Sequence, residues 1–495
     1  MSTSFSLSKV GPFFLPARYK KILLIVTSVL LLLRLLHPTA DFPAHSKWIY
    51  EPGRYTDEGW YASGAIHHAF TGHWIVAGDF NPVVCVPLWS VILHAVFTLT
   101  GVSMAAARTT SILFGIALTV LATMLFRRHY PQSSWIVFVL LAASSTLFVF
   151  SRLALLEVPM MAFCLAGMLL APRRGQSTAW RVPLSALLLA AAVLIKSSAL
   201  FLLPAILLYT WQQNREPGQP LVRSLRRPFA IAAVVATLLC IYFAAIILPN
   251  IGEARVLSNE NPLGLQWRSI EKIVRLAFRM FTWSDPVLYL AALAAVVLSL
   301  RTRALRQSPL FPFCVAWIFG YGFFCVLHLS SDPRYFVVFN IPLAFLAVLL
   351  YEESKQLSPI THRLAAVAIC IAAVLNTKET LGFILHPQYS FDSAAQQLAL
   401  TIHNSGDPHP LVLGHGAIES TLFTRIDALD NMGTFSIGEK LDTYHPGWLV
   451  LWSDDRDFLR SPDLLIRYQS IPLGSWSVMD QPTRSHLLLF RLQPR

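Results

Sequence analysis

The chain has 495 residues, of which 55% are hydrophobic and 13% are charged, and its mean hydropathy is +0.54. Soluble proteins carry roughly 25% charged residues because their surface must be hydrated, so this composition excludes a soluble enzyme and a disordered chain. The net charge of +12 does not indicate nucleic-acid binding, because the basic residues cluster between apolar runs, as in cytoplasmic loops of membrane proteins. These clusters lie at 127–128, 173–174, 223–227 and 301–306.

Near the N-terminus, a short basic segment precedes the first apolar run. Lys20 and Lys21 are followed by apolar residues at 22–36. The pattern is similar to a signal peptide, but no small-residue cleavage site follows it. We therefore interpret this run as an uncleaved first span.

The remaining apolar runs predict the topology. A spanning helix needs roughly 20 apolar residues, and the candidate runs are 20–37, 84–100, 105–126, 133–150, 158–171, 182–195, 198–211, 229–248, 285–300, 309–327, 335–351 and 363–384. If the run 84–100 lies along the outer surface, every Arg-rich loop falls on the cytoplasmic side, as expected. The sequence thus predicts about eleven transmembrane helices, with the N-terminus inside and the C-terminus outside. The first outer loop is 38–104, with a surface helix at about 84–100.

Two further segments are expected outside the membrane. The stretch 265–283 has apolar and basic residues on opposite helical faces, which is typical of a helix at the membrane surface. The apolar face carries Leu265, Ile270, Ile273, Val274, Ala277 and Phe281, and the basic face carries Arg268, Lys272, Arg275 and Arg279.

From about residue 386 the composition becomes that of an ordinary globular domain. The pattern predicts a helix at 391–404 and short strands at 411–413, 448–452 and 487–492. We therefore expect a transmembrane domain at 1–385 and a small C-terminal extracytoplasmic α/β domain at 386–495.

Ionisable residues at membrane depth each require a reason, because they are costly there. Asp57, Glu58, Glu157, Lys196 and Arg334 all fall on the predicted outer side. Each also has an ordinary structural interpretation. Thr56 or Asp57 would cap a helix, and Glu157 would pair with Arg152. Lys196 would extend its ammonium to the membrane surface, and Arg334 would pair with Asp332. His45, His67, His68 and His73 fit no zinc-helix spacing and are better interpreted as surface histidines.

Acids and cations on one membrane face suit a reaction on a lipid-linked phosphate ester. A departing phosphate needs cations to stabilise its charge, and Lys196 and Arg334 are the candidates. A hydroxyl acceptor needs a carboxylate base, for which Asp57 is suited. Glu157 either orients the acceptor or helps to hold a divalent cation, since hard cations prefer carboxylate oxygens.

The order of these motifs resembles the GT-C glycosyltransferases over about residues 20–350. The matching features are the Asp57-Glu58 pair after the first span, the NP…PL sequence at 81–88, SR-x5-E at 151–157, the isolated Lys196 and DPRYF at 332–336. Within that superfamily the chain is most similar to the protein O-mannosyltransferase and aminoarabinose (lipid A) transferase branch. That branch more often has Asp where this chain has Glu157, and the basic residue that often precedes its Pro-Pro-Leu motif is absent here.

The resemblance implies a polyprenyl- or dolichyl-phosphate-linked sugar donor, and transfer with inversion outside the cytoplasm. Asp57 matches the catalytic acid of the family's first loop. We predict catalytic roles for Asp57, Glu58 and Glu157, and donor-phosphate binding by Lys196, Arg334 and Tyr335. Asp57 and Glu157 are the candidate ligands for a divalent metal ion such as Mg, Mn or Zn. The expected acceptor is a protein, a lipid or a glycan, and the expected location is the bacterial inner membrane.

Two other functions are compatible with the hydropathy. A multi-pass transporter or lipid flippase would favour inverted repeats and charges spread to the membrane midplane, whereas no repeat is evident and the acids cluster at one face. A non-catalytic membrane assembly protein would tolerate the loss of Asp57.

Overall fold

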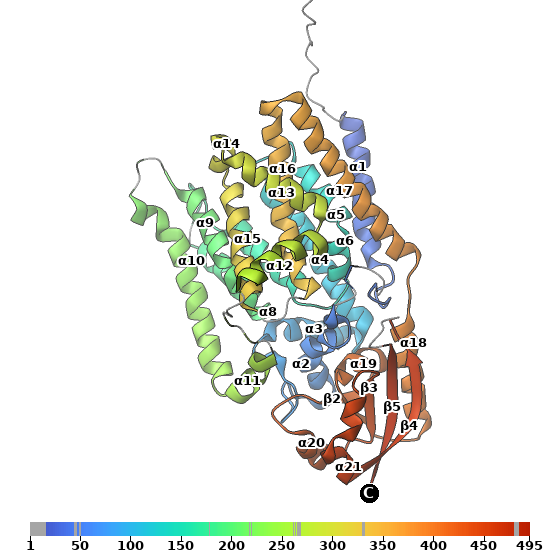
Figure 1. The fold of residues 1–495 in the computed structure, drawn as a ribbon. Helices are drawn as coiled ribbons and strands as arrows, with labels where there is room; N and C mark the ends of the chain where they lie inside the picture. Colours follow the sequence, from blue (N-terminus) through green and yellow to red (C-terminus); the bar gives the residue numbers. More distant parts are fainter. Residues whose placement is uncertain are drawn as a thin grey trace, which may run out of the picture.

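The computed structural model describes residues 16–43, 47–48, 51–177, 179–216, 218, 220–260, 262, 264, 269–328, 332–479 and 485–495. Figure 1 shows a bundle of helices with a small sheet at one end, beside α2 and α3. The principal bundle helices are α1 (Ala17–Leu32), α4 (Met104–Arg127), α5 (Ser134–Ala143), α6 (Ser145–Ser151), α7 (Glu157–Leu170), α8 (Arg181–Ile195), α9 (Leu203–Asn214), α10 (Leu221–Tyr242), α13 (Pro286–Ser299), α15 (Leu310–Leu327), α16 (Asn340–Leu357) and α17 (Pro359–Leu385).

Shorter helical elements connect the bundle helices. They are η1 (Leu33–Leu35), η2 (Pro52–Arg54), α2 (Asp57–Thr71), η3 (Pro82–Val84), α3 (Pro87–Thr100), η4 (Ser197–Phe201), η5 (Phe243–Ile247), α11 (Ile251–Glu260), α12 (Ser269–Trp283), α14 (Arg303–Gln307) and η6 (Pro333–Phe339). The predicted surface helix is α3, which begins with a proline, a residue favoured at the first helical position. Helix α12 supplies the predicted amphipathic helix from residue 269 onward, whereas Leu265 and Arg268 lie outside the described residues.

The lengths of the apolar helices support a membrane protein. Within the described residues, five segments are long and apolar enough to cross a bilayer, and α5 with α6, bent by 60°, provide a sixth. Four further apolar helices, α3, α7, α8 and α13, have 10–17 residues. The eleven-span topology therefore stays a prediction. The break between α5 and α6 is stabilised by buried Arg34, which donates to the carbonyl oxygens of Leu141 and Ala142 at 2.9 Å each.

The C-terminal α/β segment, residues 390–495, contains a five-stranded mixed sheet. Its strands are β1 (Leu411–Gly414), β2 (Asp427–Asp430), β3 (Trp448–Trp452), β4 (Tyr468–Ser477) and β5 (His486–Pro494), and its helical elements are α18 (Ser390–Asn404), α19 (Ala417–Thr424), α20 (Ile437–Tyr444), η7 (Arg456–Arg460) and α21 (Pro462–Arg467). The strand order is β2-β1-β3-β5-β4. Strand β1 pairs in parallel with β2 and β3, whereas β5 pairs antiparallel with β3 and β4.

The predicted helix at 391–404 and all three predicted strands are confirmed. Strands β2 and β4 were not predicted, because their own sequences do not show a strand pattern. Strand β2 reads Asp-Ala-Leu-Asp, too short for an alternating pattern, and β4 contains a proline and a glycine next to its register shift.

Candidate active site

Four ionised side chains from four separate elements meet at the end of the bundle that faces the C-terminal segment. Asp57 begins α2, Glu157 begins α7, Lys196 directly follows α8, and Arg334 lies in η6. All four are buried, with exposed fractions between 1% and 8%. Lys196 lies between α8, which has 15 residues, and η4, which leads into the 12-residue α9.

The four side chains form one connected ionic group. Arg334 Nη1 lies 2.6 Å from Asp57 Oδ2, and Lys196 Nζ lies 2.6 Å from Glu157 Oε1. Arg334 Nε lies 3.8 Å from that same Glu157 oxygen, so the two cations share one carboxylate. Charges this close and buried interact far more strongly than surface pairs do.

Two further acids belong to this group, which we call the Arg334 cluster: Glu51, Asp57, Glu157, Lys196, Asp332 and Arg334. Glu51 accepts from the backbone N–H of Arg334 at 2.8 Å and from its Nη1 at 3.1 Å, and Asp332 Oδ2 lies 3.0 Å from Nη2. Sequence reasoning did not select Glu51 as a site residue. The signal that could have found it is an acid followed by Pro and Gly in the first outer loop, six residues before Asp57.

Both cations of the Arg334 cluster have N–H donors that make no hydrogen bond to the described residues. Among the described residues, Glu157 is the one hydrogen-bond acceptor of the Lys196 ammonium, which has three N–H groups. Arg334 Nε is buried without a hydrogen-bond partner in the described part of the chain. The Lys196 ammonium also lies 5.0 Å from the ring centre of Tyr335 and 6.0 Å from that of Tyr61. Unfilled donors on two neighbouring cations are suited to bind an anion.

Burial shifts the pKa values of Asp57 and Glu51, the two acids of the Arg334 cluster that come from the first outer loop. Desolvation raises the pKa of Asp57 above its ordinary value, although the nearby Arg334 opposes this shift. Desolvation likewise raises the pKa of Glu51 to about 8, so Glu51 is mostly protonated at neutral pH. Of the acids that contact Arg334, Glu51 therefore carries little negative charge at neutral pH.

Comparisons with known proteins give one family profile and several similar folds. A profile of the family described as dolichyl-phosphate-mannose-protein mannosyltransferase matches residues 86–254, a range that includes Glu157 and Lys196. The crystal structure of ArnT from Cupriavidus metallidurans bound to undecaprenyl phosphate has a TM-score of 0.58 at 15% identity, covering 96% of this chain and 98% of that chain. The Archaeoglobus fulgidus oligosaccharyltransferase in complex with Zn and sulfate has a TM-score of 0.50 at 10% identity, covering 94% of this chain and 72% of that chain. No curated protein sequence matches the chain.

The family profile and the fold point to the same group as the sequence motifs. The profile matches about a third of the chain, and the two solved structures share its fold. The apolar helices of the chain indicate an integral membrane protein. The family whose profile matches residues 86–254 is one of glycosyltransferases, not of transporters or flippases.

Most of the ordinary structural interpretations of the site residues are replaced by other contacts in the structure. Glu157 pairs with Lys196, while Arg152 donates to the backbone carbonyls of Leu36 and His37. The Thr56 side chain makes no capping hydrogen bond to α2 and donates instead to Asp57 Oδ1 at 3.1 Å. The pair between Arg334 and Asp332 does form, but as one contact among several.

Glu58 has an environment of its own on the other side of the first turn of α2. Its carboxylate accepts from Arg108 Nε at 2.9 Å and Nη2 at 2.5 Å, and from the backbone N–H of Ala154 at 2.6 Å. The residue is fully buried. This pair, the Arg108 cluster, ties α2 to α4 and to the turn that precedes α7. A catalytic role for Glu58 stays a prediction.

The interpretation of the histidines as surface residues was wrong for His67. His67 is 1% exposed, and its Nε2 lies 3.2 Å from Asp79 Oδ2. Its position on the inner face of α2, against the C-terminal segment, explains the burial. His45 lies outside the described residues.

The predicted metal ligands Asp57 and Glu157 are each engaged by a cation. A divalent ion would have to displace Arg334 from Asp57 and Lys196 from Glu157. Among the described residues, no group of three His, Cys, Asp or Glu side chains is arranged to hold a metal. The metal role stays a prediction, and the mechanism below uses no metal.

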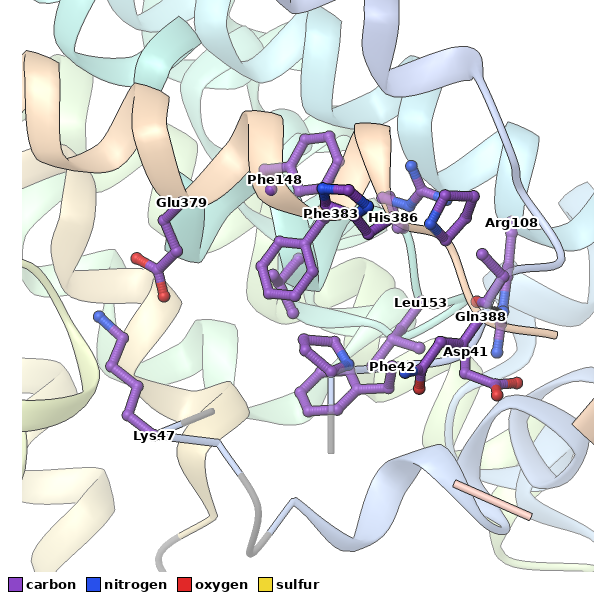
Figure 2. A pocket seen from close by; sticks show the side chains of 16 residues that line it. Asp41, Phe42, Lys47, Arg108, Phe148, Leu153, Glu379, Phe383, His386 and Gln388 are labelled. Atoms are coloured by element: carbon purple, nitrogen blue, oxygen red, sulfur yellow. Dashed lines mark hydrogen bonds between the residues drawn. The ribbon is translucent and has the colours of Figure 1, made fainter. Parts of the chain in front are cut away.

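A cavity of about 500 Å³ lies near the Arg108 cluster, between the first outer loop and the end of α17. Figure 2 shows the cavity with Lys47 and Glu379 on one side and Asp41 and Gln388 on the other. Aromatic side chains form much of its wall: Phe42, Phe148 and Phe383. Aromatic surfaces with a few charged groups are typical of pockets for polar organic ligands.

Proposed function

We propose that the protein is a membrane glycosyltransferase that moves a sugar from a polyprenyl-phosphate-linked donor to a hydroxyl acceptor. The observation that carries this proposal is the Arg334 cluster, in which a candidate base and two candidate phosphate-binding cations meet below the protein surface. ArnT, whose crystal structure contains undecaprenyl phosphate, has a similar fold. The acceptor is a hydroxyl group on a protein, a lipid or a glycan.

The reaction is a single displacement with inversion. The acceptor oxygen forms a bond to the anomeric carbon of the sugar while the bond from that carbon to the phosphate oxygen breaks. Asp57 takes the acceptor proton, and the polyprenyl phosphate leaves as an anion. Lys196 and Arg334 stabilise the charge that develops on the phosphate, with the unfilled N–H donors described above.

The remaining members of the cluster hold these groups in place. Glu157 positions Lys196, and Glu51 binds both the backbone and the guanidinium of Arg334. Asp57 must give up its contact with Arg334 to act as a base, and an incoming phosphate is the group that replaces it. The ring of Tyr335 lies against both cations and closes one side of the phosphate site.

The site is proposed to face the outside of the membrane, in accordance with the distribution of the Arg-rich loops. The location most consistent with a polyprenyl carrier is a bacterial inner membrane, with the C-terminal segment outside the cytoplasm. Cysteine accessibility along residues 88–100 tests this orientation, and labelling of opposite ends from opposite sides would contradict it.

The direct test uses purified protein in lipid nanodiscs and undecaprenyl phosphate as the probe. Binding is measured as a shift in thermal stability with increasing lipid phosphate, which ligand linkage predicts. We expect Arg334→Met to abolish the shift and Arg301→Met, an exposed arginine in a predicted cytoplasmic loop, to retain it. Equal shifts in both variants would contradict the proposed phosphate site.

A further inference from the structure

The first turn of α2 obtains its cap from a distant part of the chain. Asp57, Glu58 and Gly59 are the first three residues of α2, and Thr56 is the N-cap residue. An N-cap side chain ordinarily accepts a hydrogen bond from the second or third N–H of the helix. Thr56 makes no such bond.

The missing acceptor is supplied by Glu419, which lies on α19 in the C-terminal segment. Glu419 Oε2 accepts from the backbone N–H of Gly59 at 2.5 Å, across 360 residues of sequence. Glu419 is fully buried, so this bond has no competition from bulk water. The Thr56 hydroxyl is instead directed to the Asp57 carboxylate.

Backbone geometry on both sides requires this close approach. A Cβ atom at Gly59 would lie 2.4 Å from the backbone nitrogen of Glu419, a distance that real Cβ atoms do not show. Gly416, just before α19, has φ of +65°, and a Cβ there would lie 2.5 Å from Thr56 Cγ2. Glycine is the residue that permits such contacts between two chain segments.

Other contacts hold the same turn against the C-terminal segment. Trp60 Nε1 donates to Asp430 Oδ2 at 2.7 Å, and the same oxygen accepts from the N–H of Gly416 at 3.0 Å. The rings of Tyr55 and Trp452 lie edge to face with their centres 4.9 Å apart. The residues that flank Asp57 in sequence are therefore fixed from the C-terminal side.

We propose that Glu419 is a positioning residue, which caps α2 from the C-terminal segment and thereby fixes Asp57 for catalysis. The inference rests on the proposed function, because it assigns Glu419 to the base of that reaction. Small displacements of a catalytic group can cost about a hundredfold in rate. The C-terminal α/β segment is on this account a structural part of the active site.

The protonation of Glu419 is compatible with the cap. Burial raises the pKa of Glu419 well above its ordinary value, and repulsion from Glu58 acts in the same direction. A neutral carboxyl group still accepts a hydrogen bond through its carbonyl oxygen. The side-chain amide of glutamine can do the same, so Glu419→Gln preserves the cap.

The test compares Glu419→Gln with Glu419→Met, which has a similar volume but no acceptor. Both are measured for kcat and KM with an undecaprenyl-phosphate-linked sugar, for the pH profile of kcat/KM, and for hydrogen exchange in a peptide that contains the Gly59 amide. Glu439→Ala is the matched control, because Glu439 caps α20 within the same segment and is exposed.

We expect Glu419→Gln and Glu439→Ala to resemble the wild type. Glu419→Met should exchange the Gly59 amide faster and lower kcat about tenfold or more, with donor KM changed less than about threefold. The acid limb of kcat/KM, which reports the free enzyme, should move to higher pH, because Asp57 loses its fixed contact with Arg334. Equal exchange and equal kcat in the Gln and Met variants would overturn the proposal.

Folding failure and failure of the proposed function can both be recognised. If Glu419→Met does not fold, Glu419→Gln still decides, because loss of activity in a folded Gln variant contradicts an acceptor role. If Asp57→Asn retains wild-type turnover, the proposed function fails. If Asp57→Asn is inactive while Glu419→Met keeps wild-type kcat, the inference about Glu419 alone fails.

Discussion

The Arg334 and Arg108 clusters lie on two sides of one helical turn and differ in how completely their hydrogen-bonding groups are used. In the Arg108 cluster, Glu58 is held by one arginine and one backbone N–H, and Ala40 also accepts from the arginine at 2.8 Å. In the Arg334 cluster, four acids contact one arginine and N–H donors remain unfilled. A buried ion pair whose hydrogen-bonding groups are all used, such as Glu58 with Arg108, stabilises the fold. A buried ionic cluster with unused N–H donors, such as the Arg334 cluster, is suited to bind a ligand.

The largest expected effect is that of Asp57→Asn. The side-chain amide of asparagine cannot take the proton from the hydroxyl group that attacks the sugar. Turnover of an undecaprenyl-phosphate-linked sugar should therefore fall by about a thousandfold or more. The variant should retain wild-type expression and thermal stability, because Arg334 still contacts Glu51, Glu157 and Asp332. Single-turnover sugar transfer measures the first effect, and retained turnover would refute the role of the base.

The second prediction concerns the two cations of the Arg334 cluster. Arg334→Met should lower kcat/KM for the donor about a hundredfold, because one cation no longer stabilises the leaving phosphate. Lys196→Met should act in the same direction through the same phosphate. Donor titrations with folded variants measure this effect, and Arg334→Met with unchanged kinetics would eliminate the arginine as a phosphate ligand.

The third prediction concerns the buried pair between Glu58 and Arg108. Glu58→Gln leaves the buried Arg108 without its counter-charge, and broken buried pairs cost about 3–5 kcal/mol. We expect a lower unfolding temperature and less folded protein, with kcat per folded molecule close to wild type, in contrast to the catalytic role that the sequence predicts for Glu58. If folded Glu58→Gln is as inactive as Asp57→Asn, Glu58 is catalytic and the contrast between the clusters is lost.

The smallest expected effect is a change in pH dependence. Burial raises the pKa of Glu51 to about 8, so above this pH it ionises and adds a further negative charge beside Arg334. Donor KM should therefore rise as pH increases through 8, and Glu51→Gln should remove the rise. The acid limb of kcat should remain in both proteins, because it reports protonation of Asp57. An alkaline KM profile unchanged by Glu51→Gln would contradict this coupling.

Much of this arrangement was predictable from local sequence signals. Asp57, Glu157, Lys196 and Arg334 each interrupt or flank an apolar run, and their shared side followed from the Arg-rich loops. Helix α18 and strands β1, β3 and β5 followed from periodicity. These features depend on neighbouring residues, which a sequence displays directly.

The remaining features depend on contacts between distant segments. Glu51, Arg108 and Glu419 show their roles only once the chain is folded, because their partners lie 283, 50 and 360 residues away. Thr56 had the sequence pattern of an N-cap, but tertiary structure provided another acceptor. His67 was assigned to the surface because the covering C-terminal segment could not be predicted from the first loop.

The most direct test of the central claim is a structure of the full-length protein with undecaprenyl phosphate bound. The account predicts phosphate oxygens within about 3 Å of both Lys196 Nζ and an Arg334 nitrogen, with Asp57 released from Arg334. A phosphate bound elsewhere, with the contact between Asp57 and Arg334 unchanged, would contradict it.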